Sequence, residues 1–91
     1  MIRQTLTVQT KLGIHARAAA KLVRLTSRFS SSVYLSREGA QQEIDSKSIL
    51  GVLMLAATMG TRLAVTISGT DEAEASEAVR ALFENKFGEE D

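Results

Sequence analysis

The sequence has no cysteine and a single histidine, and both limit the chemistry open to it. Without cysteine there is no disulfide framework and no thiolate metal cluster. With one histidine and no carboxylates at metal-ligand spacing, we expect neither a structural zinc site nor a metal-assisted reaction. We therefore expect neither a metal nor a cofactor.

The chain also lacks net charge and long apolar runs. Its 11 Lys and Arg balance 11 Asp and Glu, so no overall positive field would attract DNA or RNA, and any positive site must be local. No apolar run approaches the length of a membrane span, and the N-terminus lacks the features of a signal peptide. We expect a cytoplasmic protein that neither inserts into a membrane nor binds nucleic acid.

The length of the chain allows one domain. Its 91 residues suffice for one hydrophobic core and are too few for two. We take residues 1–91 as a single domain and expect its polar end, residues 86–91, to form a frayed tail.

Four segments are predicted to be strands. Apolar and polar residues alternate over 2–9 and over 62–68, as they do in half-buried strands. Two shorter segments, near 33–35 and 42–44, flank a turn that contains Gly39 and predict a hairpin.

The first predicted helix spans about 16–28. Apolar residues recur there at three- and four-residue spacing, while basic residues lie between them. The recurring apolar positions are Ala16, Ala19, Ala20 and Val23, and Lys21, Arg24 and Arg28 lie outside this stripe.

Two further helices are predicted. One follows a cap at Asp45 or Ser46 and ends at Gly60. The other follows Asp71, which together with Glu74 suggests a capping box. The complete order, βαββαβα, predicts an α+β open-faced sandwich. Its four-stranded, mostly antiparallel sheet would be covered on one face by three helices and open to water on the other.

His15 lies between the first strand and the first helix, in the segment KLGIHARAAAKL. The first N–H groups of a helix have no intrahelical acceptor, and no Ser, Thr, Asp or Asn lies between Lys11 and Leu25 to cap them. Together with the helix dipole and the guanidinium of Arg17, they would form an anion site. Gly13 would let the chain turn sharply and leave room for a partner.

An imidazole beside an anion site is suited to accept a phosphoryl group, because its neutral form is nucleophilic near neutral pH. Phosphoryl transfer mainly requires alignment and charge stabilisation. No second acid or base accompanies His15, so the sequence favours a carrier with a covalent phosphohistidine over a stand-alone enzyme. A lone histidine is more often a surface or packing residue, and that alternative stays open.

The segments GIHARAAAKLV and SKSILGVLML closely resemble the histidine-containing phosphocarrier proteins (HPr) of the bacterial phosphoenolpyruvate-dependent phosphotransferase system, which serves sugar transport. The resemblance covers essentially the whole chain. It implies that enzyme I phosphorylates His15 on Nδ1, that Arg17 steadies the phosphoryl group, and that a IIA protein or domain accepts it. Most members have proline where this chain has Ala18, whose backbone N–H can donate to phosphate.

The resemblance also implies that Ser48 is the site modified by HPr kinase/phosphorylase, whereas we interpret Ser46 as a helix cap. A phosphate beside an apolar docking patch would repel an acidic partner. We assign to that patch, and to its basic rim, residues expected to be exposed near His15: Ala16, Ala20, Lys21, Arg24, Leu50 and Leu53.

Three alternatives compete with this interpretation, and the residues argue against the last two. The segments LGIHARAAAKL and ALFENKFGEED also resemble NPr, the regulatory carrier of the nitrogen-related branch. An RNA-recognition domain shares part of the element order but needs two or three aromatic residues on its sheet, where this chain offers Tyr34 alone. A small-ligand regulatory domain has a similar sandwich but leaves His15 and Arg17 unexplained.

Overall fold

The computed structural model describes residues 1–89. Its elements, in chain order, are β1 (Ile2–Thr7), α1 (Ala16–Thr26), β2 (Ser32–Arg37), β3 (Ile44–Asp45), α2 (Ile49–Leu55), β4 (Arg62–Ser68), α3 (Glu72–Glu84) and a short 3-10 helix, η1 (Lys86–Gly88). The predicted order is confirmed, and η1 is an addition to it. No helix in this described part of the chain has both the length and the apolar character needed to cross a bilayer.

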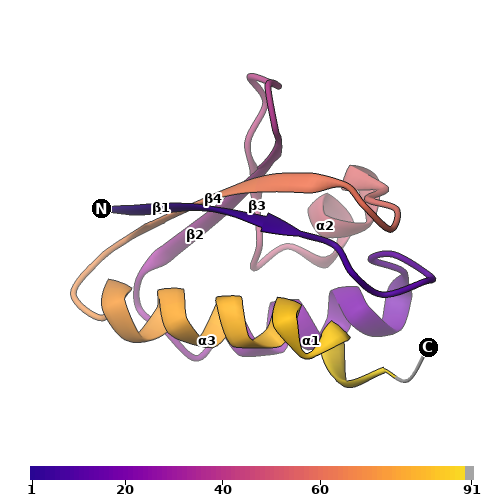
Figure 1. Cartoon of the computed structure of the whole chain (residues 1–91). Helices are drawn as coiled ribbons and strands as arrows, with labels where there is room; N and C mark the ends of the chain where they lie inside the picture. Colours follow the sequence, from indigo (N-terminus) through magenta and orange to yellow (C-terminus); the bar gives the residue numbers. More distant parts are fainter. Residues whose placement is uncertain (90–91) are drawn as a thin grey trace.

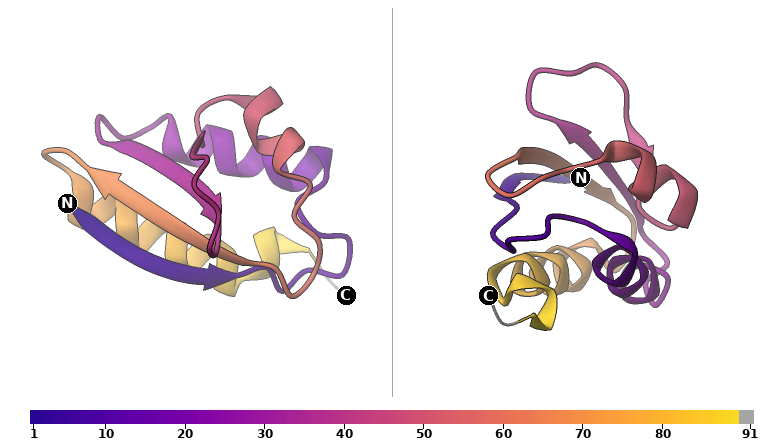
Figure 2. Two further views of the ribbon diagram at one scale, coloured as in Figure 1. Left: turned by 90° about the horizontal axis from the view of Figure 1, so that it is seen from above. Right: turned by 90° about the vertical axis from the view of Figure 1, so that its right-hand side faces the viewer.

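The four strands form one sheet in the order β1-β4-β2-β3, in which every neighbouring pair is antiparallel. Alternation separates its two faces: on β4 the side chains of Leu63, Val65 and Ile67 are buried, while those between them are not. Helices α1 and α3 lie side by side against the apolar face, and α2 packs beside β3 and against α1 (Figures 1 and 2). The predicted open-faced α+β sandwich is confirmed.

The buried side of α1 matches the predicted apolar stripe only in part. Ala18, Ala19, Leu22 and Thr26 are buried, whereas Ala16 is exposed. Leu22 determines which side of α1 faces the core, because it is the large apolar side chain on this helix that is fully buried. Alanine is found on both the buried and the exposed side of helices. A pattern made mostly of alanine therefore did not determine which side of α1 faces the sheet.

Both ends of α2 differ from the prediction. Ser48 is its N-cap, and its Oγ accepts a hydrogen bond from the N–H of Gly51 at 3.2 Å. Ser46, the predicted cap, is fully buried, and its hydroxyl has no hydrogen-bond partner within the described residues. The helix ends before Ala56, which adopts the left-handed conformation (φ 50°), rather than at Gly60.

The predicted capping box of α3 is wrong. Asp71 occupies the N-cap position but makes no capping bond with its side chain. Its carboxylate instead accepts hydrogen bonds from the backbone of Ser30 and Ser31 and from the Ser31 hydroxyl. The Ser31 hydroxyl is the largest cause that lowers the pKa of Asp71 to about 2. Asp71 therefore ties the start of α3 to the loop before β2.

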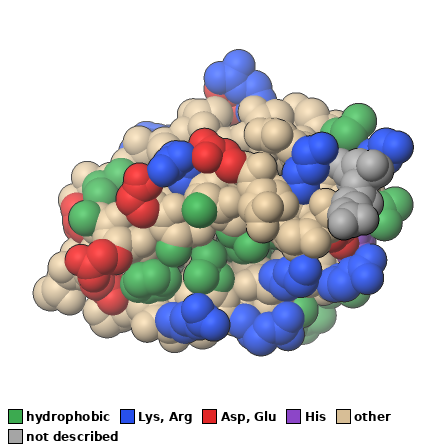
Figure 3. Space-filling model, turned by 60° about the horizontal axis from the view of Figure 1, so that its bottom comes forward, with side chains coloured by type: hydrophobic (Ala, Val, Ile, Leu, Met, Phe, Trp, Pro, Cys, Tyr) green, Lys and Arg blue, Asp and Glu red, His purple; other side chains and the backbone are tan. Residues whose placement is uncertain are grey.

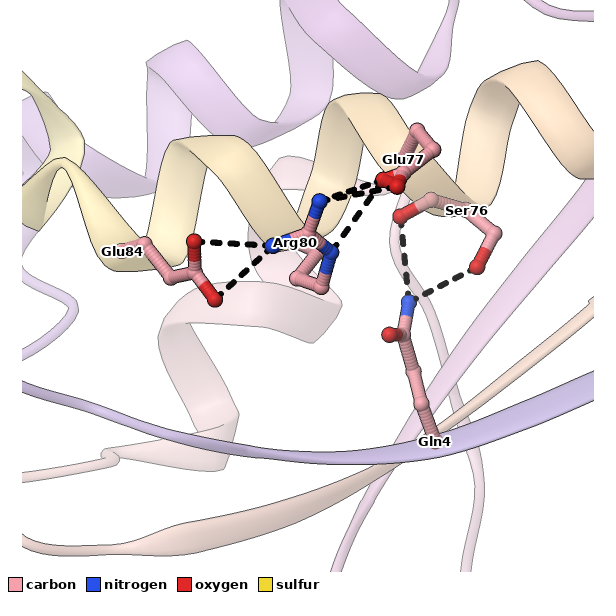
Figure 4. Close-up of polar contacts among 5 residues, drawn as sticks. All are labelled: Gln4, Ser76, Glu77, Arg80 and Glu84. Carbon is pink, nitrogen blue, oxygen red and sulfur yellow. Dashed lines mark hydrogen bonds and ion pairs between the residues drawn. The ribbon is translucent and has the colours of Figure 1, made fainter.

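Gln4 gives α3 a polar tie to the sheet. Its side-chain amide donates to the carbonyl and to the hydroxyl of Ser76, at 3.1 and 3.0 Å (Figure 4). Along the same helix, Arg80 forms ion pairs with Glu77 and Glu84. Exposed pairs of this kind contribute little to stability, so the strand–helix contact is the more consequential of the two.

Residues 86–89 do not form the frayed tail that the sequence predicted. Phe87 is fully buried, with its ring centroid 4.9 Å from that of Phe83. The ammonium group of Lys21 donates to the carbonyl of Phe87 at 2.7 Å. The segment is mostly polar, which predicted a frayed tail, but its one aromatic residue, Phe87, packs in the core. Residues 90 and 91, also assigned to the tail, lie outside the described residues.

Replacing Phe87 by alanine should lower the free energy of unfolding by about 3–5 kcal/mol, the usual loss for a buried phenylalanine. Urea denaturation measures this change. Met54→Ala is the control, because the Met54 side chain is 80% exposed, and its replacement should change stability by less than about 0.5 kcal/mol. A loss at Phe87 no larger than that of the control would show that the C-terminal segment lies outside the core.

The Asp71 contacts should make stability depend on pH. The folded pKa of about 2 lies below the ordinary 3.8, so the ionised carboxylate stabilises the fold above about pH 4. This contribution is lost as the pH falls toward about 2. Asp71→Asn should therefore lower stability at neutral pH and flatten its decrease over that range, whereas Glu74→Gln should leave the decrease as in the parent. Urea midpoints measured against pH that fall in parallel for parent and Asp71→Asn would contradict this account.

Candidate functional site

The loop that carries His15 is packed against the chain after α2. The N–H of Ile14 donates to the carbonyl of Ala57 at 2.8 Å. Gly13 has a positive φ (+68°), and a Cβ at this position would come within 2.4 Å of the Ala57 oxygen. The glycine therefore makes room for the protein's own backbone, and not, as predicted, for an approaching partner. As a result His15 sits on a firmly packed turn.

His15 is itself the N-cap residue of α1. Its backbone is extended, and its Nδ1 accepts a hydrogen bond from the N–H of Arg17 at 3.3 Å. Its carbonyl accepts from the N–H of Ala19 at 2.8 Å. The prediction that the local chain offers no acceptor to this helix start is therefore wrong. The sequence did not predict this cap, because histidine is not one of the usual N-cap residues.

A carboxylate from the far end of the chain also reaches His15. One oxygen of Glu89, Oε2, lies 2.7 Å from Nε2 of His15 and 3.2 Å from Nε of Arg17. The other oxygen accepts a hydrogen bond from the hydroxyl of Thr10 at 2.7 Å. In Figures 1 and 2 the segment after α3 lies against the loop that precedes α1. The sequence assigned Glu89 to a tail and so missed it; Phe87, two residues earlier, was the available signal.

These partners assign the tautomer of His15. The pKa of the Glu89 carboxyl is lowered, chiefly by the hydrogen bond from Thr10 and then by that from His15, although burial opposes the shift. Glu89 is therefore ionised at neutral pH and can only accept, so Nε2 carries the proton. Nδ1 accepts from Arg17 and so keeps its lone pair. The neutral ring directs an unprotonated nitrogen toward the start of α1.

Arg17 and Ala18 place donors next to that nitrogen. The Arg17 side chain is 67% exposed. Within the described residues, its Nε donates to the carboxylate of Glu89. Its terminal nitrogens can therefore turn to an anion. Ala18 directs its methyl group into the core, and its backbone N–H has no acceptor within the described residues. The site thus offers donors for the oxygens of a phosphoryl group attached to Nδ1.

An exposed apolar surface lies on α2. Leu50, Leu53 and Met54 are 70%, 37% and 80% exposed, and their spacing places them on one side of the helix. We call these three residues the α2 surface. Ser48 lies at the start of the same helix and is exposed, with its hydroxyl engaged by Gly51. Apolar side chains left in water in this way are typical of a site that binds another protein.

The residues predicted on α1 are arranged less uniformly. Ala16 and Arg24 are exposed, whereas Ala20 and Lys21 are half-buried, and the Lys21 ammonium donates to the Phe87 carbonyl. On the helix-covered side of the molecule, Lys and Arg side chains gather along the lower and right-hand parts of the view, with acidic side chains toward the left (Figure 3). The basic part of this side would complement an acidic protein.

Comparisons with known proteins agree with the resemblance seen in the sequence. The family model for the phosphorylation site of the HPr component of the phosphotransferase system (PTS-HPr) matches residues 2–85. The phosphocarrier protein HPr of Xylella fastidiosa (strain Temecula1) is 50% identical over 90 residues, which cover 99% of each chain. The crystal structure of HPr from Thermoanaerobacter tengcongensis superposes with a TM-score of 0.92 at 37% identity and also covers 99% of each chain.

The nitrogen-related alternative is not favoured. The phosphocarrier protein NPr of Proteus mirabilis is 40% identical over 84 residues, which cover 91% of each chain. Both its identity and its coverage are lower than those of the Xylella relative. The relatives therefore support the HPr resemblance more strongly than the NPr resemblance.

Proposed function

Because this chain belongs to the HPr family of phosphocarrier proteins of the phosphotransferase system, we propose that it accepts its phosphoryl group on Nδ1 of His15. One observation carries this assignment. The contacts of the ring place the proton on Nε2 and leave the Nδ1 lone pair directed at the start of α1. This is the nitrogen that the family resemblance implies, and here it follows from the hydrogen-bond partners of the ring.

The proposed transfer needs little from the protein beyond alignment and charge. The Nδ1 lone pair forms the bond to phosphorus while the bond to the donor's leaving group breaks. The developing charge on the phosphoryl oxygens is met by the Arg17 guanidinium and by the amides of Arg17 and Ala18. In the onward step the acceptor's nucleophile takes the phosphoryl group, and the lone pair returns to Nδ1. This chemistry is that of a carrier rather than a stand-alone enzyme.

Phosphotransferase-system proteins are the partners that membership of the family implies. We infer that enzyme I is the donor and that a IIA protein or domain is the acceptor, both in the cytoplasm. The α2 surface and the basic part of α1 around Arg24 support docking of proteins with acidic rims. His15 is partly exposed, with 27% of its side chain accessible, so a docked partner can reach it.

We further propose that Ser48 is a site of regulatory phosphorylation by an HPr kinase/phosphorylase. It is exposed, and as the N-cap of α2 it lies where backbone amides favour a phosphate group. The modification would place nearly two negative charges beside the α2 surface. An acidic partner would then be repelled, so phosphate at Ser48 would regulate traffic through His15 without unfolding the helix.

Incubation with enzyme I and labelled phosphoenolpyruvate tests the assignment of His15. The parent should gain one acid-labile phosphate, and His15→Ala should gain none. Arg17→Gln should be labelled about 100-fold more slowly, the usual loss when one charge-stabilising donor is removed. Unchanged urea midpoints will show that both variants are folded. Labelling of His15→Ala at the parent's rate would exclude the proposed acceptor.

A purified HPr kinase with ATP tests the assignment of Ser48. Intact mass should show one added phosphate on the parent and none on Ser48→Ala. Ser46→Ala is the matched control: Ser46 lies two residues away but is fully buried, so its replacement should leave modification intact. Equal phosphorylation of Ser48→Ala and the parent would exclude Ser48 as the modified residue.

A further inference from the structure

Two groups that the proposed reaction needs share one carboxylate oxygen. Oε2 of Glu89 contacts both Nε2 of His15 and Nε of Arg17. The Glu89 side chain is only 9% exposed, although it is the last residue that the structure describes. A carboxylate is seldom this buried unless its oxygens are satisfied by donors, and here His15, Arg17 and Thr10 satisfy them.

Glu89 is placed by contacts on both of its sides. Phe87 anchors the preceding residues in the core, and the N–H of Glu89 donates to the carbonyl of Lys86 at 3.0 Å. Lys86 and Phe87 both adopt left-handed conformations, with φ of 54° and 56°, which turn the chain back toward the loop before α1. Thr10 is fully buried, and its hydroxyl holds the second oxygen of Glu89. The carboxylate is thus part of a built site.

We propose that Glu89 is a positioning residue for the phosphoryl carrier reaction, an inference that rests on the function proposed for His15. By accepting from the N–H at Nε2, it keeps the proton on the nitrogen that does not react and turns the Nδ1 lone pair toward the start of α1. By accepting from Nε of Arg17, it holds the guanidinium beside the ring. A single carboxylate thereby aligns the acceptor nitrogen and the charge that receives the phosphoryl oxygens.

The same contact assists departure of the phosphoryl group. With phosphorus on Nδ1 and the proton retained on Nε2, the ring is a cation, and the Glu89 carboxylate stabilises it. When the acceptor takes the phosphoryl group, the bond between nitrogen and phosphorus breaks and its electron pair returns to Nδ1. The ring then leaves as neutral imidazole with its proton still on Nε2. No proton has to move in either direction.

Glu89→Gln tests this role, because glutamine preserves the size of the side chain and removes its charge. Its amide can also donate to Nε2, which would favour the opposite tautomer. The ¹⁵N chemical shifts of the His15 ring, measured where the ring is neutral, should move toward a proton on Nδ1. Transfer from enzyme I should slow by about 10- to 100-fold, by analogy with the loss when the hydrogen-bonded partner of a metal-ligating histidine is replaced. Glu84→Gln, which removes an exposed carboxylate from α3, is the charge-matched control.

The two proposals fail in different ways. If the function proposed for His15 is wrong, the parent is not labelled by enzyme I, or His15→Ala is labelled as well. If the role of Glu89 is wrong, the parent is labelled on His15, but Glu89→Gln matches Glu84→Gln within about 2-fold in rate and in its ring ¹⁵N shifts. A purely structural tether would lower the urea midpoint of Glu89→Gln without moving the tautomer, and that result would also overturn the proposal.

Discussion

The imidazole of His15 is held between a backbone amide and a carboxylate, and the chemistry of the site depends on this arrangement. The amide of Arg17 lies at Nδ1 and the carboxylate of Glu89 lies at Nε2. A donor on one side and an acceptor on the other leave the ring one favourable neutral tautomer. The nitrogen with the lone pair is therefore the nitrogen that faces the start of α1, where donors for phosphate gather. Position and reactivity have the same physical cause.

The fold brings the required groups together from three parts of the chain. Thr10 and His15 come from the loop after β1, Arg17 from the first turn of α1, and Glu89 from the segment after α3. These segments meet at one end of the sandwich because α1 and α3 lie side by side on the same face of the sheet (Figure 2). Phe87 then fixes the last described residues at that end. The core thus positions the site as well as stabilising the domain.

In the proposed function, reaction and recognition use separate elements of the fold. The proposed phosphoryl site is built from backbone amides and charged side chains, while the α2 surface is apolar and exposed. Ser48 lies at the start of the helix that carries this surface and is its N-cap. A charge added there would act on docking and leave the His15 contacts in place. A small carrier can in this way be regulated without any change at its reactive nitrogen.

The sequence alone predicted the element order, the open-faced sandwich, and the place of His15 and Arg17 at a helix start. These features depend on periodicity and on residues a few positions apart, which a single chain displays directly. Tertiary structure decided the rest. His15 and Glu89 are 74 positions apart, and Ser31 and Asp71 are 40 apart. Gly13 meets Ala57 only because two loops pack together. Such contacts form only when the chain folds and apolar residues such as Phe87 pack in the core. A local sequence pattern therefore does not predict them.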